Sequence, residues 1–425
     1  MTMEHDNKYN NKCNNKSPYY FSITRRFALM GLASFLGASS GLLTSTANAD
    51  NGFKHWIAEF RTVAFNAGIT PATYALAFKG VDSPDPEVLK KANYQPEFTD
   101  PTWNYFDNRV QDNAIALGRS HAKKWGKWLN SIEKRFGVDR NTLLAIWSIE
   151  SDYGAAMDRD TAMRYAIRSL ATLAYGDKRR SKYAQTQLIA ALKILQSGDI
   201  DRSHLMGSWA GALGHTQFIP TSYLTYAVDM DGDGKRDIWT SVPDALATAA
   251  NLLHKNGWQT GRTWGYEVIL PEGQKFPSGS LTLAEWARLG VRRANGKPFP
   301  TPSDKATLKL PDGTNGPVFL VTKNFFVIKR YNSADRYAFA VGLLSDRIAG
   351  YPGLVKDWDR PFTGISIQER QEVQSHLAAL GYYHGKIDGK NGEVTKNAIK
   401  AFQSRNGLKP DGNPSRELLT ILRKR

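Results

Sequence analysis

Cysteine is nearly absent from this sequence of 425 residues, and so are long apolar runs. A single cysteine, Cys13, excludes a disulfide within the chain. It lies upstream of the extended apolar run at residues 28–43, whereas a lipid-modified cysteine would have to follow that run. The run is also shorter than the roughly 20 apolar residues that span a bilayer, and Gly and Ser interrupt it. A permanent membrane anchor is therefore the disfavoured alternative.

The residues around this run are typical of an export signal. An arginine pair, Arg25-Arg26, precedes it, and Ala47-Asn48-Ala49 follows it as a small-residue cleavage site. We predict a signal peptide over residues 1–49, with cleavage after Ala49. The arginine pair and the long polar lead indicate the twin-arginine route, and the mature protein is expected to be periplasmic.

Acidic residues are outnumbered, with 40 Asp and Glu against 56 Lys and Arg and a net charge of +16. The predicted signal peptide carries +3 of this, so the mature chain would keep about +13. Such a charge favours a polyanionic partner. Nucleic acid is the usual one, but export and the lack of a concentrated basic stripe favour the cell wall. Solubility alone is the alternative explanation.

The remaining composition is that of a folded protein of two or three domains, with 41% hydrophobic and 11% aromatic residues. Apolar residues at three- and four-residue steps predict helices over residues 53–80, 103–136, 139–154, 170–196, 244–256 and 335–349. Short β-like runs lie at residues 266–270, 306–310, 318–321 and 325–329. Residues 81–101 are rich in Pro and Asp and are expected to form a surface connection. We therefore predict a mainly α fold with a small inserted β-sheet.

The helix over residues 139–154 carries the main catalytic candidate. Asp139 is a suitable N-cap, and Gly154 can end the helix. Glu150 falls on the same face as three apolar residues. Apolar surroundings raise the pKa of a carboxyl group, which makes it a usable proton donor for cleaving a glycosidic bond. Taken alone, the helix also allows Glu150 to be a peripheral residue paired with a Lys or Arg.

A second motif changes this balance. Residues 207–223 read Gly-Ser-Trp-Ala-Gly-Ala-Leu-Gly-His-Thr-Gln-Phe-Ile-Pro-Thr-Ser-Tyr. Its small residues let the backbone approach a ligand, and its aromatic residues suit sugar faces. Together with Glu-Ser-Asp-Tyr-Gly at residues 150–154, it resembles the lysozyme-like lytic transglycosylases, specifically the lytic murein transglycosylase B family. The resemblance covers roughly residues 53–350, with further agreement at residues 330–333 and 337–341.

The resemblance implies a single acid/base, Glu150. It would protonate the glycosidic oxygen between N-acetylmuramic acid and N-acetylglucosamine, and then deprotonate the muramyl 6-hydroxyl to leave a 1,6-anhydromuramyl end. A two-carboxylate glycosidase would need a second acid across the cleft, and Asp152 points off the Glu150 face. The resemblance also implies glycan-binding roles, for which ordinary packing is the alternative, for Ser208, Gln217, Tyr331, Asn332 and Tyr337.

A third motif, residues 229–240, follows the order of a calcium loop, with Gly234 at the sharp turn. The candidate ligands in this order are Asp229, Asp231, Asp233, the backbone carbonyl of Lys235, and Asp237. Thr240 stands where a bidentate Glu is usual, and the resemblance implies that Asp244 closes the site instead. We expect a weak structural Ca²⁺ site and no cofactor for the chemistry. An Asp/Gly turn capped by its own side chains is the alternative.

The last sixty residues predict a helix, a turn at Asp388-Gly389, a second helix, a turn at Asp411-Gly412 and a third helix. They resemble the peptidoglycan-binding type 1 domain, which implies that glycan strands of the wall are the partner. The expected organisation is a signal peptide at 1–49, a lysozyme-like catalytic domain at 50–350, a linker at 351–364 and a peptidoglycan-binding domain at 365–425. A hydrolytic muramidase of the same fold and a non-catalytic wall-binding protein remain the alternatives.

Overall fold

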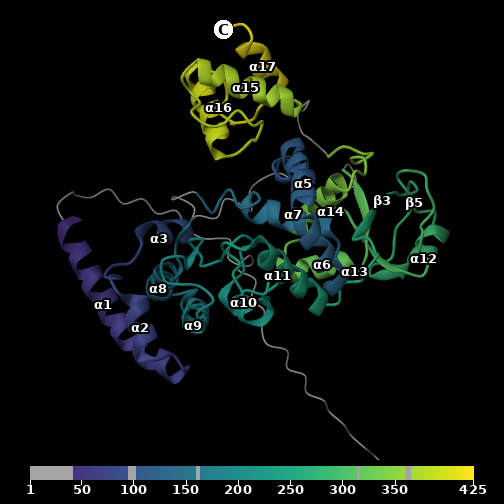
Figure 1. The fold of residues 1–425 in the computed structure, drawn as a ribbon. Coiled ribbons are helices and arrows are strands. Elements are labelled where there is room, and N and C mark those ends of the chain that lie inside the picture. The colour runs from purple at the N-terminus through teal and green to yellow at the C-terminus, as the bar shows by residue number, and fades with distance from the viewer. Residues whose placement is uncertain (1–41, 94–101, 159–162, 314–315, 359–364) are drawn as a thin grey trace, which may run out of the picture. The chain divides into compact units, whose positions relative to one another are not determined.

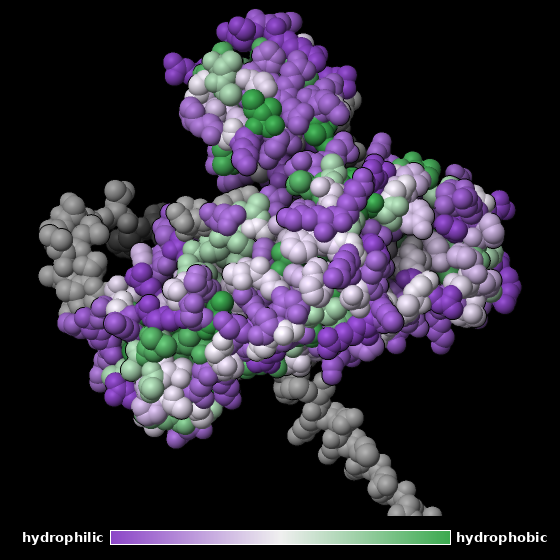
Figure 2. Space-filling model, viewed as in Figure 1, coloured by the Kyte–Doolittle hydropathy of each residue, from purple (hydrophilic) through white to green (hydrophobic). Residues whose placement is uncertain are grey.

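The computed structural model describes residues 42–93, 102–158, 163–313, 316–358 and 365–425 (Figure 1). Most of the signal predicted from the sequence lies outside these residues. None of the helices in the described ranges combines the length and apolar character needed to cross a membrane. Figure 2 shows that the face in view is mainly hydrophilic, so most large apolar side chains lie in the cores.

The larger part of the chain is a helical body around one apolar core, which runs from Phe53 to Trp358. Its helices are α1 (Leu42–Asn66), α2 (Pro71–Phe78), α3 (Pro86–Asn93), α4 (Thr102–Asp107), α5 (Asp112–Lys124), α6 (Gly126–Phe136), α7 (Arg140–Ser151), α8 (Ala166–Gly176), α9 (Ser181–Ser197), α10 (Pro220–Tyr226), α11 (Val242–Lys255), α13 (Lys323–Tyr331) and α14 (Asp335–Ile348). A two-stranded antiparallel ladder joins β1 (Arg164–Tyr165) to β2 (Met206–Gly207). Helix α7 lies deep in this body, because residues 142–147 are all buried.

An antiparallel sheet of five strands is inserted before α13, in the order β4-β6-β7-β3-β5. Its elements are β3 (Gly265–Ile269), β4 (Ser280–Thr282), α12 (Leu283–Arg288), β5 (Arg292–Arg293), β6 (Lys305–Lys309) and β7 (Val318–Val321). Side chains alternate across β7, as the strand period requires. Phe319 and Val321 join the main core, whereas Val318 and Leu320 pack with Trp286 of α12 in a second core.

The C-terminal module has its own core and three helices, α15 (Ile367–Ala379), α16 (Glu393–Arg405) and α17 (Arg416–Leu422). Two glutamines hold its predicted turns. The Oε1 atom of buried Gln374 accepts from the Gly389 amide at 2.7 Å. Gln403 accepts from the Gly412 amide at 2.9 Å and donates to Asp411 Oδ1 at 2.8 Å. Both glycines have positive φ, which explains why each turn needs glycine.

The predicted fold class is confirmed, but several elements differ from the prediction. Residues 325–329 form part of helix α13, not a strand, because Phe325 and Ile328 are buried on one helical face while Phe326 is exposed. Helix α11 begins at Val242, before the predicted start at residue 244, because Ser241 is its N-cap and accepts from the Asp244 amide. Helix α3 lies within the connection predicted at residues 81–101. β4, β5 and α12 were not predicted, because they are too short for a clear period.

The contact between α7 and α14 contains two acidic side chains that titrate abnormally. Asp139 caps α7 by accepting from the Thr142 amide at 2.9 Å. Asp346 of α14 accepts from the indole of Trp264 at 3.0 Å. Burial, followed by the nearby charge of Asp139, raises the pKa of Asp346 to about 7.

This shift predicts a pH-dependent stability. From about pH 4 to about 7 the folded chain keeps a proton on Asp346 that the unfolded chain has lost. The wild type should therefore lose stability relative to Asp346→Asn as pH rises through this window, by at most about 1.4 kcal/mol per pH unit. Urea unfolding from pH 4.5 to 8 measures the difference. The control Asp82→Asn, at an exposed site, keeps Asp346 and should therefore run parallel to the wild type, whereas a parallel Asp346→Asn curve would contradict the assignment.

Candidate active site

The C-terminal end of α7 holds Glu150 against α14. Glu150 is half-buried and is the last residue but one of the helix. The hydroxyl of buried Tyr337, on α14, donates to Glu150 Oε1 at 2.6 Å. Burial raises the pKa of Tyr337 well above its usual range, and the charge of Glu150 adds to the effect. Tyr337 is therefore a neutral phenol that keeps its proton and serves as a hydrogen-bond donor to the carboxylate.

A second tyrosine stands beside this pair. The ring of Tyr331, at the end of α13, stacks on that of Tyr337, with centroids 6.2 Å apart and planes 8° from parallel. Its hydroxyl donates to the carbonyl oxygen of Thr216. Burial also raises the pKa of Tyr331, again with Glu150 as the second cause. The tyrosine pair thus connects the Glu150 carboxylate to the backbone of residues 207–219, called here the glycine-rich loop.

Hydrogen bonds within the glycine-rich loop give it a defined shape. The hydroxyl oxygen of Ser208 accepts from the amides of Ala210 and Ala212, at 3.3 and 3.1 Å. The side-chain amide of Gln217 donates to the carbonyl of Gly214 at 2.8 Å. Gly214 has a φ of +65°, and a Cβ there would lie 2.4 Å from the carbonyl oxygen of Ile238. Only glycine allows this close approach of two backbones.

The loop is also joined to α7 through His215. The Ser151 hydroxyl donates to the His215 carbonyl at 2.5 Å, and the Trp147 indole donates to His215 Nδ1 at 3.2 Å. Burial lowers the pKa of His215, which keeps its ring neutral and Nδ1 able to accept. Gly154 lies against the same ring, where a Cβ would come 2.4 Å from Cε1. The glycine that follows Glu150 is therefore required by packing as well as by its φ of +90°.

Backbone strain gathers in the same region. In the described part of the chain, the non-glycine residues with positive φ are Asp152, Tyr153 and Gln217, at 55°, 56° and 50°. Each such residue costs on the order of 1–3 kcal/mol and persists only where its surroundings impose it. Tyr153 is held by its hydroxyl, which donates to the carbonyl of Ala114 at 2.7 Å. Two of the three lie within three residues after Glu150, and the third lies in the loop that Tyr331 anchors, so the strain makes this region a candidate functional site.

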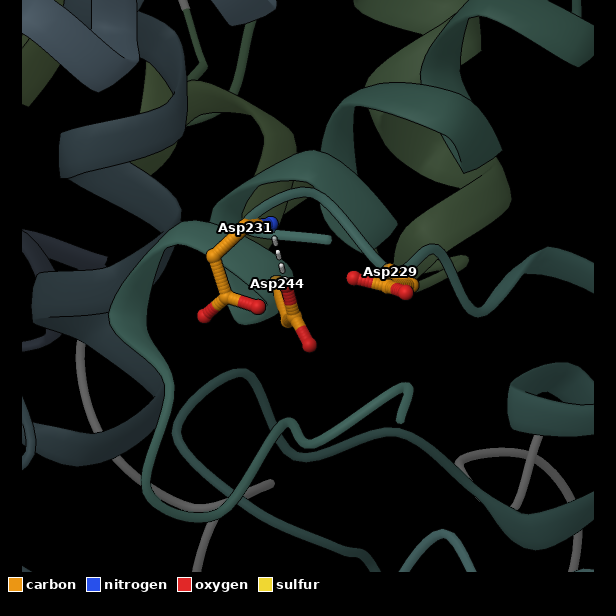
Figure 3. Close-up of side chains that lie close together, drawn as sticks. All are labelled: Asp229, Asp231 and Asp244. Carbon is orange, nitrogen blue, oxygen red and sulfur yellow. Dashed lines mark hydrogen bonds between the residues drawn. The ribbon is translucent and has the colours of Figure 1, made fainter. Parts of the chain in front are cut away.

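The acidic loop at residues 229–240 brings together part of the predicted ligand set. Figure 3 shows Asp229, Asp231 and Asp244 directed toward one space, and one ligand oxygen from each lies within 4.8 Å of the others. The carboxylates of Asp233 and Asp237 are not in this cluster and accept from amides of their own loop. The three clustered carboxylates suit a hard cation with oxygen ligands. Asp229 and Asp244 also accept from amides of this loop, so the alternative of a self-capped turn fits the contacts as well.

The acidic loop packs on the glycine-rich loop. The amide of His215 donates to the carbonyl of Ile238 at 2.9 Å, and the indole of Trp239 donates to the carbonyl of Met206 at 2.8 Å. Arg236, where a calcium loop usually has an apolar residue, binds Asp199 with its amide and guanidinium. The acidic loop therefore supports the segment that carries Ser208 and Gln217.

Comparison with known proteins accounts for both parts of the chain. The Transglycosylase SLT domain family matches residues 52–346, and the peptidoglycan binding domain family matches residues 366–422. The chain belongs to the transglycosylase SLT domain family. This result confirms the resemblance inferred from the two motifs.

Among curated relatives, membrane-bound lytic murein transglycosylase B of Escherichia coli (strain K12) is 31% identical over 226 residues. The alignment spans 52% of this chain and 60% of that relative. SltB3 from Pseudomonas aeruginosa, solved in complex with NAG-anhNAM-pentapeptide, is 44% identical with a TM-score of 0.69, covering 87% of this chain and 99% of that one. The soluble lytic transglycosylase SltB1 of the same organism is 26% identical with a TM-score of 0.59, covering 70% and 98%.

The five predicted glycan-binding residues fall into two groups, one beside Glu150 and one in loops. Tyr337 contacts Glu150 directly, and Tyr331 stacks on Tyr337. Ser208 and Gln217 lie in the glycine-rich loop, where their side chains bind its backbone. Asn332 accepts from the amide of Ala334 and so precedes α14 as a turn residue. The hydrogen bonds of these last three are those of ordinary loop structure.

Sequence reasoning missed Trp147, Ser151 and His215, which join α7 to the glycine-rich loop. Trp147 and Ser151 belong to the helix predicted at residues 139–154, and His215 belongs to the motif at residues 207–223. Neither pattern indicates which residues of the two segments are in contact. Their partners are 64 and 68 positions away. Only the folded structure shows that the two segments meet, through these hydrogen bonds and through Gly154 against His215.

The Tyr337 contact predicts a catalytic defect without unfolding. Tyr337→Phe removes one hydrogen bond to a charged group, which should lower kcat on peptidoglycan about 10- to 100-fold. Turnover of purified sacculi measures the loss, and the thermal midpoint checks the fold. Tyr74→Phe is the matched control, because its hydroxyl donates to the carbonyl of Ile57 in the α1–α2 pair. Equal losses in both variants would contradict a role specific to Glu150.

Proposed function

We propose that this protein is a lytic transglycosylase that cleaves the β-1,4 bond between N-acetylmuramic acid and N-acetylglucosamine in peptidoglycan without water. The observation that carries the proposal is the Glu150 carboxylate, which receives a hydrogen bond from the neutral phenol of Tyr337 at the strained end of α7. Membership of the transglycosylase SLT domain family supports the same reaction class. The alignment covers 60% of the curated relative, so activity and substrate are proposed here for the whole chain.

The reaction needs one group that gives a proton and then takes one back. Glu150, protonated at the start, donates to the glycosidic oxygen as the bond to the muramyl C1 breaks. The resulting carboxylate then removes the proton from the muramyl 6-hydroxyl, whose oxygen bonds to C1 and closes the 1,6-anhydro ring. Protons balance, and no water enters. Tyr337 holds the carboxyl group in one orientation and stabilises its charged form by donation to Oε1.

The glycan would contact the glycine-rich loop and the tyrosine pair. We assign Ser208, Gln217, Tyr331, Asn332 and Tyr337 to glycan binding by the family resemblance, and for Tyr331 and Tyr337 also by their place beside Glu150. For Tyr331 and Tyr337 the contribution is mainly indirect, since their hydroxyls bind the protein itself. Gln217, held in a strained conformation, is the strongest candidate for direct contact.

The remaining parts of the proposal concern location and tethering. The leader at residues 1–49 would direct export, after which the chain acts in the periplasm as a soluble protein. The catalytic domain would extend to residue 350 and the linker to residue 364. The C-terminal module would hold wall fragments near Glu150 and so raise the local substrate concentration.

We further propose that Asp229, Asp231 and Asp244 hold a structural Ca²⁺. Their oxygens are close enough to share an ion, and fully buried Asp244 is held in place by the amides of Met230 and Asp237. The ion would stabilise the acidic loop and, through Trp239, the adjoining glycine-rich loop. The other predicted ligands would reach the ion only if the loop rearranges; these are Asp233, the Lys235 carbonyl and Asp237.

Glu150→Gln tests the reaction. Gln keeps the shape of the side chain but cannot supply a proton, so sacculus clearing should fall about 10²- to 10⁴-fold while binding to sacculi persists. Mass spectrometry of wild-type digests should find 1,6-anhydro ends, and reducing ends alone would show a hydrolytic muramidase. The exposed Glu87→Gln is the control. Full activity of Glu150→Gln would contradict the proposed role of Glu150 as acid and base.

Calcium binding predicts a change in thermal stability. Saturating Ca²⁺ at about 100 times Kd should stabilise the wild type by about 2.7 kcal/mol relative to a chelator. Asp229→Asn should lose most of this gain, because it removes one of three clustered carboxylates. Asp233→Asn should keep it if the three-residue cluster is the site. The measurement is the thermal midpoint of each of the three proteins with Ca²⁺ and with EDTA. Identical wild-type midpoints in the two conditions would contradict the proposed Ca²⁺ site.

A further inference from the structure

A cavity of about 850 Å³ lies in the inserted sheet, between the end of β3, β5, α12 and the loop at residues 294–302. Its lining is mainly apolar and includes Ile269, Leu283, Ala287 and Phe299. Ile269 is 57% exposed, which is unusual for a large aliphatic side chain on a strand. The cavity is broadly open to solvent, so it is a surface groove rather than an enclosed pocket.

The sheet separates this cavity from the proposed reaction. Leu283 and Val291 line the cavity and belong to the second core, on the α12 side of β7. Phe319 and Val321 project from the opposite side of β7 into the core that contains α7. Figure 1 shows α12 and β5 at the end of the sheet away from α7. The cavity is therefore no part of the Glu150 site, and no step of the proposed reaction uses it.

Three cations and no carboxylate line the cavity. Arg292 and Arg293 form the edge strand β5, and Lys297 follows in the loop. Arg292 and Lys297 are exposed, and neither pairs with an acidic side chain in the described residues. Arg293 lies over the ring of Tyr266 at 4.9 Å and donates to the carbonyl of Pro298 at 3.0 Å. Its guanidinium is thus held in place beside an apolar floor.

We propose that this cavity binds a short acidic segment of another protein, with a bulky apolar side chain seated between β5 and α12. Charge complementarity to Arg292, Arg293 and Lys297 would select the carboxylates. Edge strand β5 has only two residues, and the carbonyl of Arg293 already accepts from the Gly296 amide, so the side chains rather than the strand edge would recognise the peptide.

The binding of a labelled synthetic peptide, Asp-Glu-Leu-Phe-Asp-Glu, tests this surface by fluorescence polarisation with the full mature chain. We expect binding with a Kd on the order of 10–100 μM, weakened at least about 10-fold when Leu-Phe becomes Gly-Ser. Arg292→Glu with Lys297→Glu should weaken it by a similar factor. Ala287→Trp, which fills the cavity without changing charge, should do the same.

The double variant Lys134→Glu with Lys255→Glu is the matched control, because it makes the same charge change at exposed sites on α6 and α11. It should bind the peptide within about 2-fold of the wild type, and every variant should clear sacculi normally, since none touches the Glu150 site. Absence of peptide binding, equal weakening in the control, or insensitivity to Ala287→Trp would overturn the proposal. Competition by soluble muropeptides at the same concentration would assign the cavity to the wall instead.

Discussion

The hydrogen bond from Tyr337 to Glu150 depends on how the helices of the helical body pack. It requires α7 and α14 to pack at one distance and rotation, because a phenol and a carboxylate on facing helices meet only in one register. The α7 end is held by its N-cap and by burial of most of its length. The α14 end is held by the stack of Tyr331 on Tyr337. The proposed proton donor, Glu150, is thus placed by rigid helices rather than by a mobile loop.

The cost of this placement appears in the backbone that follows Glu150. Asp152 and Tyr153 adopt left-handed conformations, so the chain turns away immediately after the carboxylate instead of continuing the helix. The turn brings Gly154 onto His215 and so joins α7 to the glycine-rich loop. The local strain is compensated by these tertiary contacts, as expected where function rather than stability selects a conformation. The acidic loop adds support from the other side of the glycine-rich loop.

The inserted sheet divides its two faces between different environments. One face completes the main core around Phe319, and the other forms a second core with Trp286 of α12. This division lets the strands and loops of the outer face change without disturbing α7. As proposed here, the charged cavity on that face and the C-terminal peptidoglycan binding domain would both act on where the protein works rather than on the bond it cleaves.

Local patterns in the sequence were sufficient for the fold class, the helix that ends at Glu150 and the C-terminal module, because helical period, capping and Asp-Gly turns are short-range properties. Residues 325–329 have strand-like composition, and only burial of Phe325 and Ile328 against the core decided for a helix. Likewise the acidic loop matched a calcium pattern, but packing decided that Asp229, Asp231 and Asp244 cluster while Asp233 and Asp237 do not. The Tyr337–Glu150 and Trp147–His215 contacts join residues 187 and 68 positions apart. Which distant side chains meet depends on how the helices pack, and no local pattern in the chain encodes that.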